Sequence, residues 1–96
     1  MSTYLEEIAA LIRAELPDGV AFPAEADHLF VLYAVLLRAK GTAVTGSDVH
    51  DVWAAWRLQT RPGHPSIVPF AELDDPTQRL DEPFAAAIRR VALRLS

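Results

Sequence analysis

Apolar residues recur at helical spacing along most of the chain, and residues that cap or end helices separate the periodic segments. The first segment, Thr3 to Leu16, has its apolar positions three or four residues apart, as one face of an α-helix requires. Glu6 and Glu7 lie near its start, where the helix dipole favours acidic side chains. Because Pro17 to Gly19 then interrupts the pattern, we expect the first helix to end there.

The second periodic segment predicts a helix from about Pro23 or Ala24 to Lys40, just before Gly41. Glu25 and Asp27 would lie in its first turn, the placement that the helix dipole favours. Residues 29–37 are apolar on every side of this helix. Such a helix is either central in the fold or shared with a partner chain.

The third predicted helix begins after Thr45, which can cap it, with Asp48 three residues on as the reciprocal acid of a capping box. Pro62 and Gly63 end it. Its apolar stripe consists of Val49, Val52, Trp53 and Trp56.

Residues 69–73 and the Asp75–Pro76 step each predict a short helical turn. A last helix is expected to begin at Pro83, capped by Asp81 or Glu82, and to run to about Leu95. No segment shows a strand pattern, and no internal repeat is present. We therefore expect one all-α domain over residues 1–96, a bundle of four main helices with one or two short helical turns.

Composition narrows the classes of protein to consider. The chain has 96 residues, 51% of them hydrophobic, which suits one domain with a single core. No apolar run approaches the ~18 residues of a membrane span, and Glu6 and Glu7 interrupt any apolar start, so we expect neither a membrane partner nor a secretory signal. The absence of cysteine fits a reducing compartment, and we expect a cytoplasmic protein.

The charge pattern argues against a nucleic-acid partner. The formal net charge is −4, and the basic residues are eight arginines and one lysine. The second and third helices resemble a helix-turn-helix in spacing, yet the third opens with Asp48 and Asp51 and has only Arg57 near its end. A helix that reads DNA needs donors toward the phosphates. We therefore expect no nucleic-acid binding.

The stretch from Thr45 to Phe70 concentrates the residues that most often form sites. It contains both tryptophans and two of the three histidines, beside a proline-rich turn. Trp53 and Trp56 lie three apart and so share a helix face, where they form either part of the core or the wall of a groove.

The sequence shows no pattern that indicates catalysis or metal binding. Asp48, His50 and Asp51 do not give the paired spacing of helical metal motifs. The glycines are scattered one per connection, and no serine has a nucleophile context. We therefore expect no catalytic residue, no metal and no cofactor.

Two hypotheses for function follow. The first is a small binding or adaptor protein that docks to an unknown protein partner or to itself as a homodimer. Self-association would use the apolar second helix, because that helix offers more apolar surface than a small bundle easily covers. The residues expected at this contact are Phe30, Val31, Tyr33 and Leu37.

The second hypothesis is a small-molecule module that stacks a base-like ring and meets a phosphate through Arg61. Its pocket would be lined by His50, Trp53, Trp56, Arg61, His64 and Phe70. The two hypotheses differ in one structural requirement: a pocket needs Arg61 and His64 to point inward, and an adaptor does not.

Taken whole, the chain resembles a family of small uncharacterised proteins from actinobacteria and their phages. The resemblance rests on helix-like segments over residues 4–16 and 26–40 and on two motifs. The motifs are Val49–His50–Asp51 with both tryptophans, and His64–Pro65–Ser66 followed by Pro69–Phe70 and Glu72–Leu73. It implies a phage or prophage origin, and hence the host cytoplasm, but no activity.

Residues 49–91 are also similar to the ryanodine-receptor repeat module, in which a histidine-bearing helix precedes a His/Pro loop and a closing helix. The matching positions are His50, His64, Pro65, Phe70, Glu72, Leu73, Ile88 and Val91, with Phe70 where the module usually has Trp and Asp81 where it commonly has Asn. This resemblance implies ligand or partner binding at the Trp53 to Phe70 corner.

Overall fold

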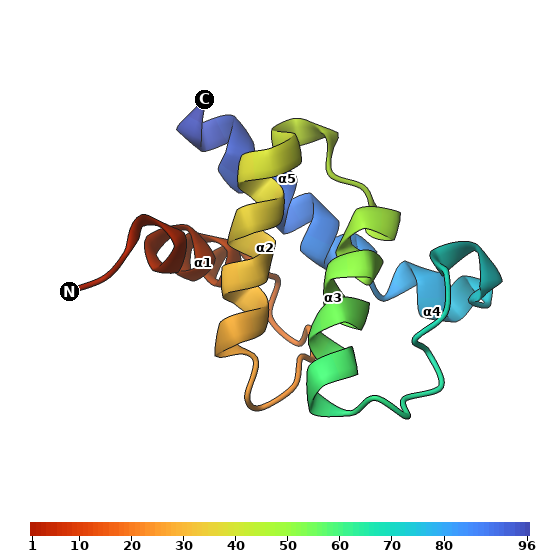
Figure 1. Cartoon of the computed structure of the whole chain (residues 1–96). Coiled ribbons are helices and arrows are strands. Elements are labelled where there is room, and N and C mark those ends of the chain that lie inside the picture. The colour runs from red at the N-terminus through yellow and green to blue at the C-terminus, as the bar shows by residue number, and fades with distance from the viewer.

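The computed structural model describes all residues, 1–96, and its regular elements are all helical. Four long helices form the bundle: α1 (Tyr4–Glu15), α2 (Asp27–Lys40), α3 (Gly46–Thr60) and α5 (Glu82–Leu95) (Figure 1). Three short helical segments join them: η1 (Gly41–Ala43), η2 (Phe70–Glu72) and α4 (Asp75–Arg79). The predicted all-α bundle is therefore confirmed, and η1 is the short segment that the sequence pattern did not predict.

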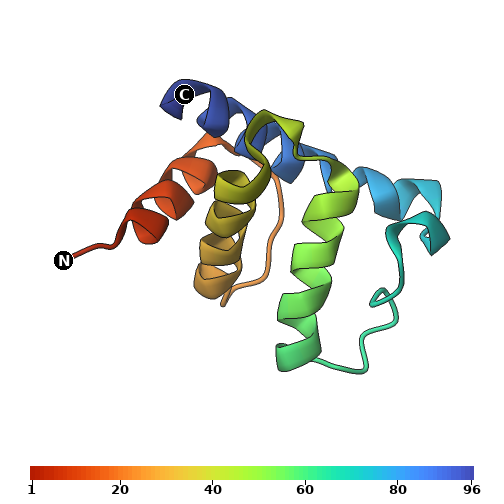
Figure 2. The ribbon, with the colours of Figure 1, turned by 45° about the horizontal axis from the view of Figure 1, so that its top comes forward.

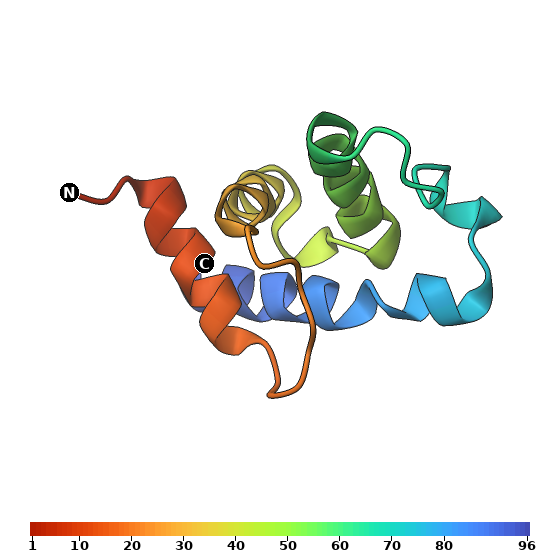
Figure 3. The ribbon, with the colours of Figure 1, turned by 90° about the horizontal axis from the view of Figure 1, so that it is seen from below.

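The long helices α2, α3 and α5 pack in two layers. α2 and α3 lie side by side, run in opposite directions and are joined through η1 (Figure 2). α5 lies beneath both of them, and α1 crosses one end of the bundle, where it packs against α2 and α5 (Figure 3). The chain between α3 and η2 runs back along the outer side of α3 (Figure 2).

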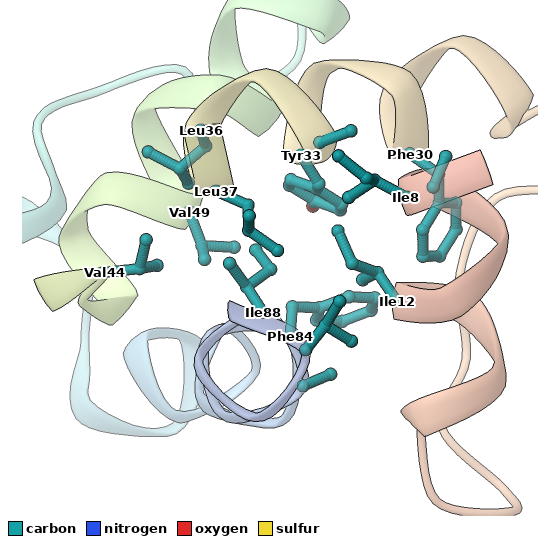
Figure 4. Packing of buried hydrophobic residues seen from close by; sticks show 14 of the residues in the cluster. Ile8, Ile12, Phe30, Tyr33, Leu36, Leu37, Val44, Val49, Phe84 and Ile88 are labelled. Atoms are coloured by element: carbon teal, nitrogen blue, oxygen red, sulfur yellow. The ribbon is translucent and has the colours of Figure 1, made fainter. Parts of the chain in front are cut away.

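The core lies where α1, α2, α3 and α5 meet (Figure 4). Aromatic rings fill its centre: Phe30 meets Tyr33 edge-on at 5.5 Å between ring centroids, and Tyr33 meets Phe84 at 5.8 Å. Edge-on pairs of this kind stabilise a core beyond the area they bury. The aliphatic residues around the rings include Ile8, Ile12, Leu37, Val49 and Ile88. None of the helices has the length and apolar content needed to cross a membrane.

Local capping fixes where α1 and α3 begin. The predicted box at α3 is present: the Thr45 hydroxyl accepts the N–H of Asp48, and the Asp48 carboxylate accepts the N–H of Thr45 at 2.9 Å. Thr3 and Glu6 form a second box at the start of α1. Lys40 adds an ion pair to Asp48 at 2.9 Å, and this bond does most to lower the pKa of the Asp48 carboxyl.

The predicted start of the second helix near Pro23 is wrong, because α2 begins at Asp27. Glu25 therefore lies in a turn before the helix and not in its first turn. The Phe22 ring packs edge-on against Phe30, with 5.2 Å between centroids. A continuous helix would separate these two residues by about 12 Å along its axis, so the contact requires the chain to turn before Asp27.

Candidate binding site

The segment between α3 and η2, residues 61–69, folds back through two consecutive turns, and we call it the returning segment. The N–H of His64 donates to the carbonyl of Arg61 at 3.0 Å, and the N–H of Ile67 donates to the carbonyl of His64 at 3.2 Å. Pro62 and Pro65 occupy the second position of each turn, where the fixed φ of proline suits the turn geometry. All peptide bonds of the chain are trans. The two turns place His64 beside α3.

His50 fastens this segment to α3. Its side chain is 3% exposed, and its Nε2 atom lies 2.7 Å from the carbonyl oxygen of Val68. A carbonyl only accepts, so Nε2 carries a proton and donates. The His50 ring also stacks on Trp53, with 5.6 Å between centroids and 26° between planes, and it contacts Phe70 at 6.0 Å. His50 thus joins α3, the returning segment and η2.

Trp53 and His64 form the accessible part of this aromatic cluster. Both are half-buried, and their rings meet edge-to-face with 5.0 Å between centroids. The Nδ1 atom of His64 accepts the N–H of Ser66 at 3.1 Å. In the neutral imidazole the proton must then sit on Nε2, which makes that atom a donor.

Two arginines lie next to Trp53 and His64. Arg57 and Arg61 follow Trp53 at intervals of four residues, so all three share one stripe along α3 and its C-terminal end. Burial, then the charges of Arg61 and Arg57, lower the pKa of His64, which keeps its ring neutral at pH 7. We call Trp53, Arg57, Arg61 and His64 the basic corner.

The arginines of the basic corner form no ion pair, unlike most other cations of the chain. Four other arginines pair with carboxylates, and so does the lysine: the paired cations are Arg13, Lys40, Arg89, Arg90 and Arg94. At neutral pH the basic corner therefore presents hydrogen-bond donors and two uncompensated positive charges.

Arg57 also connects the basic corner to the core. Its guanidinium carbon lies 4.6 Å from the centroid of the Trp56 ring, and its Nε atom is buried without a hydrogen-bond partner. Trp56 itself is 5% exposed and belongs to the core. The two tryptophans thus have different surroundings, although they lie only three residues apart.

Asp81 closes the cluster from the side of α5. It occupies the N-cap position of α5, but its side chain makes no capping bond. The carboxylate is 15% exposed, and its Oδ2 atom lies 3.9 Å from Nδ1 of His50. Burial raises the pKa of Asp81 to about 6, against the opposing effect of His50. Burial, and then the charge of Asp81, also raise the pKa of Tyr33 on α2.

The structure brings most of the predicted pocket residues together and separates the others. His50, Trp53, His64 and Phe70 are in contact. Arg61 lies at the edge of this group and is exposed, and Trp56 lies in the core. Of the residues predicted for self-association, Phe30, Tyr33 and Leu37 are buried within the single chain, and Val31 is half-buried.

Two residues of this region, Arg57 and Asp81, are not among the site residues predicted from the sequence. The sequence pattern could have identified Arg57, because it lies four residues from both Trp53 and Arg61. It could not have identified Asp81, because no local spacing pairs Asp81 with His50.

Two grooves lie elsewhere on the surface. One, of about 260 Å³ between α1 and α2, is lined by Glu6, Ala9, Ala10, Arg13, Asp27, Phe30 and Val31. The other, of about 490 Å³ beside α5, is lined by Thr42, Ala86, Arg89, Arg90 and Leu93. Neither includes a residue of the basic corner. Nowhere do three or more His, Cys, Asp or Glu side chains form a group that could hold a metal ion.

Comparison with known proteins adds a family but no activity. Residues 3–93 match the family described as "Domain of unknown function (DUF7701)". Neither a curated protein nor a solved structure matches the chain.

Proposed function

We propose that this chain, which belongs to the DUF7701 family, is a small non-catalytic adaptor that docks to an acidic segment of a protein partner through the basic corner. The observation that carries the proposal is the pair of uncompensated arginines, Arg57 and Arg61, beside two half-buried aromatic rings. Guanidinium groups bind carboxylates through two parallel hydrogen bonds. A local positive charge on a chain of net charge −4 also orients an acidic partner toward this corner.

The exposure of Arg61 favours a macromolecular partner over an enclosed small ligand. Small-molecule sites bury about 70–90% of the ligand surface, which requires the polar groups to point into a cavity. Arg61 instead lies at the surface, at the C-cap of α3. No carboxylate pairs with His64 to form an acid–base couple, so the corner offers recognition without a catalytic arrangement.

A binding assay with acidic peptides tests the proposal. Fluorescence anisotropy would measure the affinity of the whole protein for labelled peptides in which Glu and Asp alternate with aromatic or small residues. The double variant Arg57→Gln/Arg61→Gln should bind roughly tenfold more weakly, since two exposed charge pairs contribute about 1.4 kcal/mol together. Affinity should also fall with added salt.

Arg38→Gln is the matched control, because it removes one exposed arginine at the C-terminal end of α2, the opposite end of the antiparallel α2–α3 pair. This variant should bind as the parent does. Equal affinity of the double variant and the parent, or no binding of any acidic peptide at micromolar concentration, would overturn the proposal.

A small-molecule module is the alternative, and the contact between the rings of Trp53 and His64 supports it. A flat, anionic ligand such as a nucleotide could stack on such rings. Thermal melting against a nucleotide panel tests it: a ligand at ~100 times its dissociation constant adds about 2.7 kcal/mol, or several degrees for a domain of this size. A shift with nucleotides but no binding of acidic peptides would favour this alternative.

Self-association as a homodimer has narrower support. Val35 of α2 is 46% exposed, and half-buried Val31 lies one turn away on the same face. Val31 also lines the groove between α1 and α2. Sedimentation from micromolar to millimolar concentration would detect a dimer, and Val35→Glu should abolish it. A strict monomer over that range excludes this mode.

The resemblances described above support two further parts of the proposal. The likeness of residues 49–91 to the ryanodine-receptor repeat module supports partner binding at the same corner. The likeness to actinobacterial and phage proteins supports a phage or prophage origin and a role in the host cytoplasm.

A further inference from the structure

His50 lies between two hydrogen-bond acceptors. On one side its Nε2 atom donates to the Val68 carbonyl at 2.7 Å, and on the other its Nδ1 atom faces the Asp81 carboxylate at 3.9 Å. A neutral imidazole has one N–H group and can satisfy only one acceptor. The 3.9 Å between Nδ1 and Oδ2 of Asp81 is an ion-pair distance, too long for a hydrogen bond, so a second proton, on Nδ1 or on the Asp81 carboxyl, is needed to compensate the buried carboxylate charge.

We propose that one proton shared between His50 and Asp81 regulates the basic corner, which is ordered while the proton is present and loosened when it is lost. This regulation rests on the proposed function for its effect on affinity, but the change in structure does not depend on a ligand. With the proton present, either the imidazolium donates to the Val68 carbonyl while its positive charge offsets the Asp81 carboxylate, or the Asp81 carboxyl is itself neutral.

Loss of the proton leaves a buried negative charge on Asp81 that no neighbouring group compensates. Asp81 is 15% exposed and forms no hydrogen bond to another side chain, and the nearest charged or titratable groups from other elements are His50 on α3 and Tyr33 on α2. Tyr33 is itself buried and uncharged at neutral pH. The buried carboxylate would then face the lone pair of Nδ1. A pKa of about 6 for Asp81 agrees with a carboxyl that keeps its proton more readily than usual.

Two rearrangements would stabilise this buried charge, and both alter the basic corner. If the single His50 proton moves to Nδ1 to meet Asp81, the bond to Val68 is lost, and the segment that carries His64 is released from α3. If Asp81 instead turns toward solvent, the start of α5 moves away from Phe70 and the first turn of α3. Gly46 lies close to both residues: a Cβ atom added to Gly46 would lie 3.6 Å from the Phe70 ring and 3.8 Å from the Cβ atom of Asp81.

Titration of the ligand-free protein tests the structural part. NMR of the imidazole nitrogens reports the protonation and tautomer of each histidine, and amide exchange reports the ordering of residues 64–70. Between about pH 5 and 9, the parent should show a step in the His50 nitrogens together with a loss of protection in this segment at high pH, with exchange expressed relative to the intrinsic rate at each pH. Asp81→Asn should abolish the step in exchange, because its neutral amide leaves no buried charge at any pH.

His64→Gln is the control that separates the titration of His64 from that of the pair, and its exchange step should persist. A parent protein without any step, or an Asp81→Asn variant that keeps it, would overturn the inference. The outcome does not require any partner to be known.

The functional part uses the acidic-peptide assay at several pH values with the parent and with Asp81→Asn, which both keep His64, so that its own titration cancels in the comparison. Between pH 5.5 and 8 the affinity of the parent should fall roughly fivefold or more relative to that of Asp81→Asn. If no peptide binds but the exchange step behaves as expected, the proposed function fails and the proton switch stands. If peptides bind with the same affinity at every pH, the regulation is overturned and the proposed function stands.

Discussion

The His50 imidazole and the Val68 carbonyl are 18 residues apart in the sequence and 2.7 Å apart in the structure. This bond closes the proline-rich segment onto α3 and sets the position of His64 relative to Trp53. Because His50 is 3% exposed, a ligand cannot reach it. His50 therefore positions the corner and does not line its surface.

Replacement of His50 by Phe should destabilise the protein by about 1–3 kcal/mol, because the Val68 carbonyl loses its donor while an aromatic ring still fills the space. Urea denaturation at pH 7 would measure the change in the free energy of unfolding. His28→Phe is the control, since His28 is exposed at the start of α2 and its replacement should change stability by less than about 0.5 kcal/mol. A His50→Phe variant as stable as the parent would show that the Val68 bond contributes nothing.

Replacement of Asp81 by Asn should stabilise the protein at high pH and not at low pH. The pKa of Asp81 is raised from 3.8 to about 6 in the folded state, so its favourable contribution is present below about pH 4 and is lost as the pH rises through 6. The full shift corresponds to at most about 3 kcal/mol. The neutral amide of the variant avoids the buried charge, so we expect the variant to be more stable by about 1–3 kcal/mol at pH 8.

Denaturation of both proteins at pH 4 and pH 8 checks this result. The carboxyls of Glu6, Asp48 and Asp74 have lowered pKa values, so their contributions are lost as the pH falls. They are the same in both proteins and cancel in the comparison. A stability difference that does not change between pH 4 and pH 8 would contradict the assigned role of Asp81.

The sequence predicted the features that depend on residues close together in the chain. Thr45 and Asp48 lie three residues apart, and their reciprocal hydrogen bonds depend on little else. Because residues 29–37 are apolar on every side, the sequence predicted a helix that is either central or shared with a partner chain. The structure shows this helix in the core, packed against α1, α3 and α5.

The candidate site was less predictable because it depends on distant parts of the chain. Trp53 and Trp56 share a helix face, yet the returning segment meets Trp53 while Arg57 covers Trp56. The place of Asp81 beside His50 depends on how α5 passes beneath α3, which local spacing does not encode.

The glycines at the two ends of the connection between α2 and α3 should respond oppositely to alanine. Gly41 has a φ of +55°, which alanine adopts only with strain, so Gly41→Ala should destabilise the protein by about 1 kcal/mol or more. Gly46 begins α3 without a positive φ, and a Cβ there would make ordinary contacts with Phe70 and Asp81. Gly46→Ala should therefore stabilise the protein by about 0.5 kcal/mol.

Thermal or urea denaturation of the two variants measures this contrast directly. Each variant serves as the control for the other, because both make the same chemical change at the two ends of one short connection. A loss of stability in Gly46→Ala as large as that in Gly41→Ala would show that the start of α3 has less room than its geometry indicates.

Glu15 joins the end of α1 to α5, and its two arginine partners should differ in importance. Arg90 binds both the Glu15 carboxylate and the Glu15 backbone carbonyl, each at 3.0 Å, whereas Arg94 binds only the carboxylate at 2.8 Å. Arg90→Gln should therefore destabilise the protein by about 1–1.5 kcal/mol and Arg94→Gln by about 0.5 kcal/mol.

Urea denaturation at low salt and at about 1 M salt separates the two kinds of bond, because salt screens the ion pairs and not the bond to the carbonyl. At high salt the effect of Arg94→Gln should vanish, and that of Arg90→Gln should fall only in part. Equal losses for the two variants at both salt concentrations would mean that the bond to the Glu15 carbonyl does not hold α1 to α5.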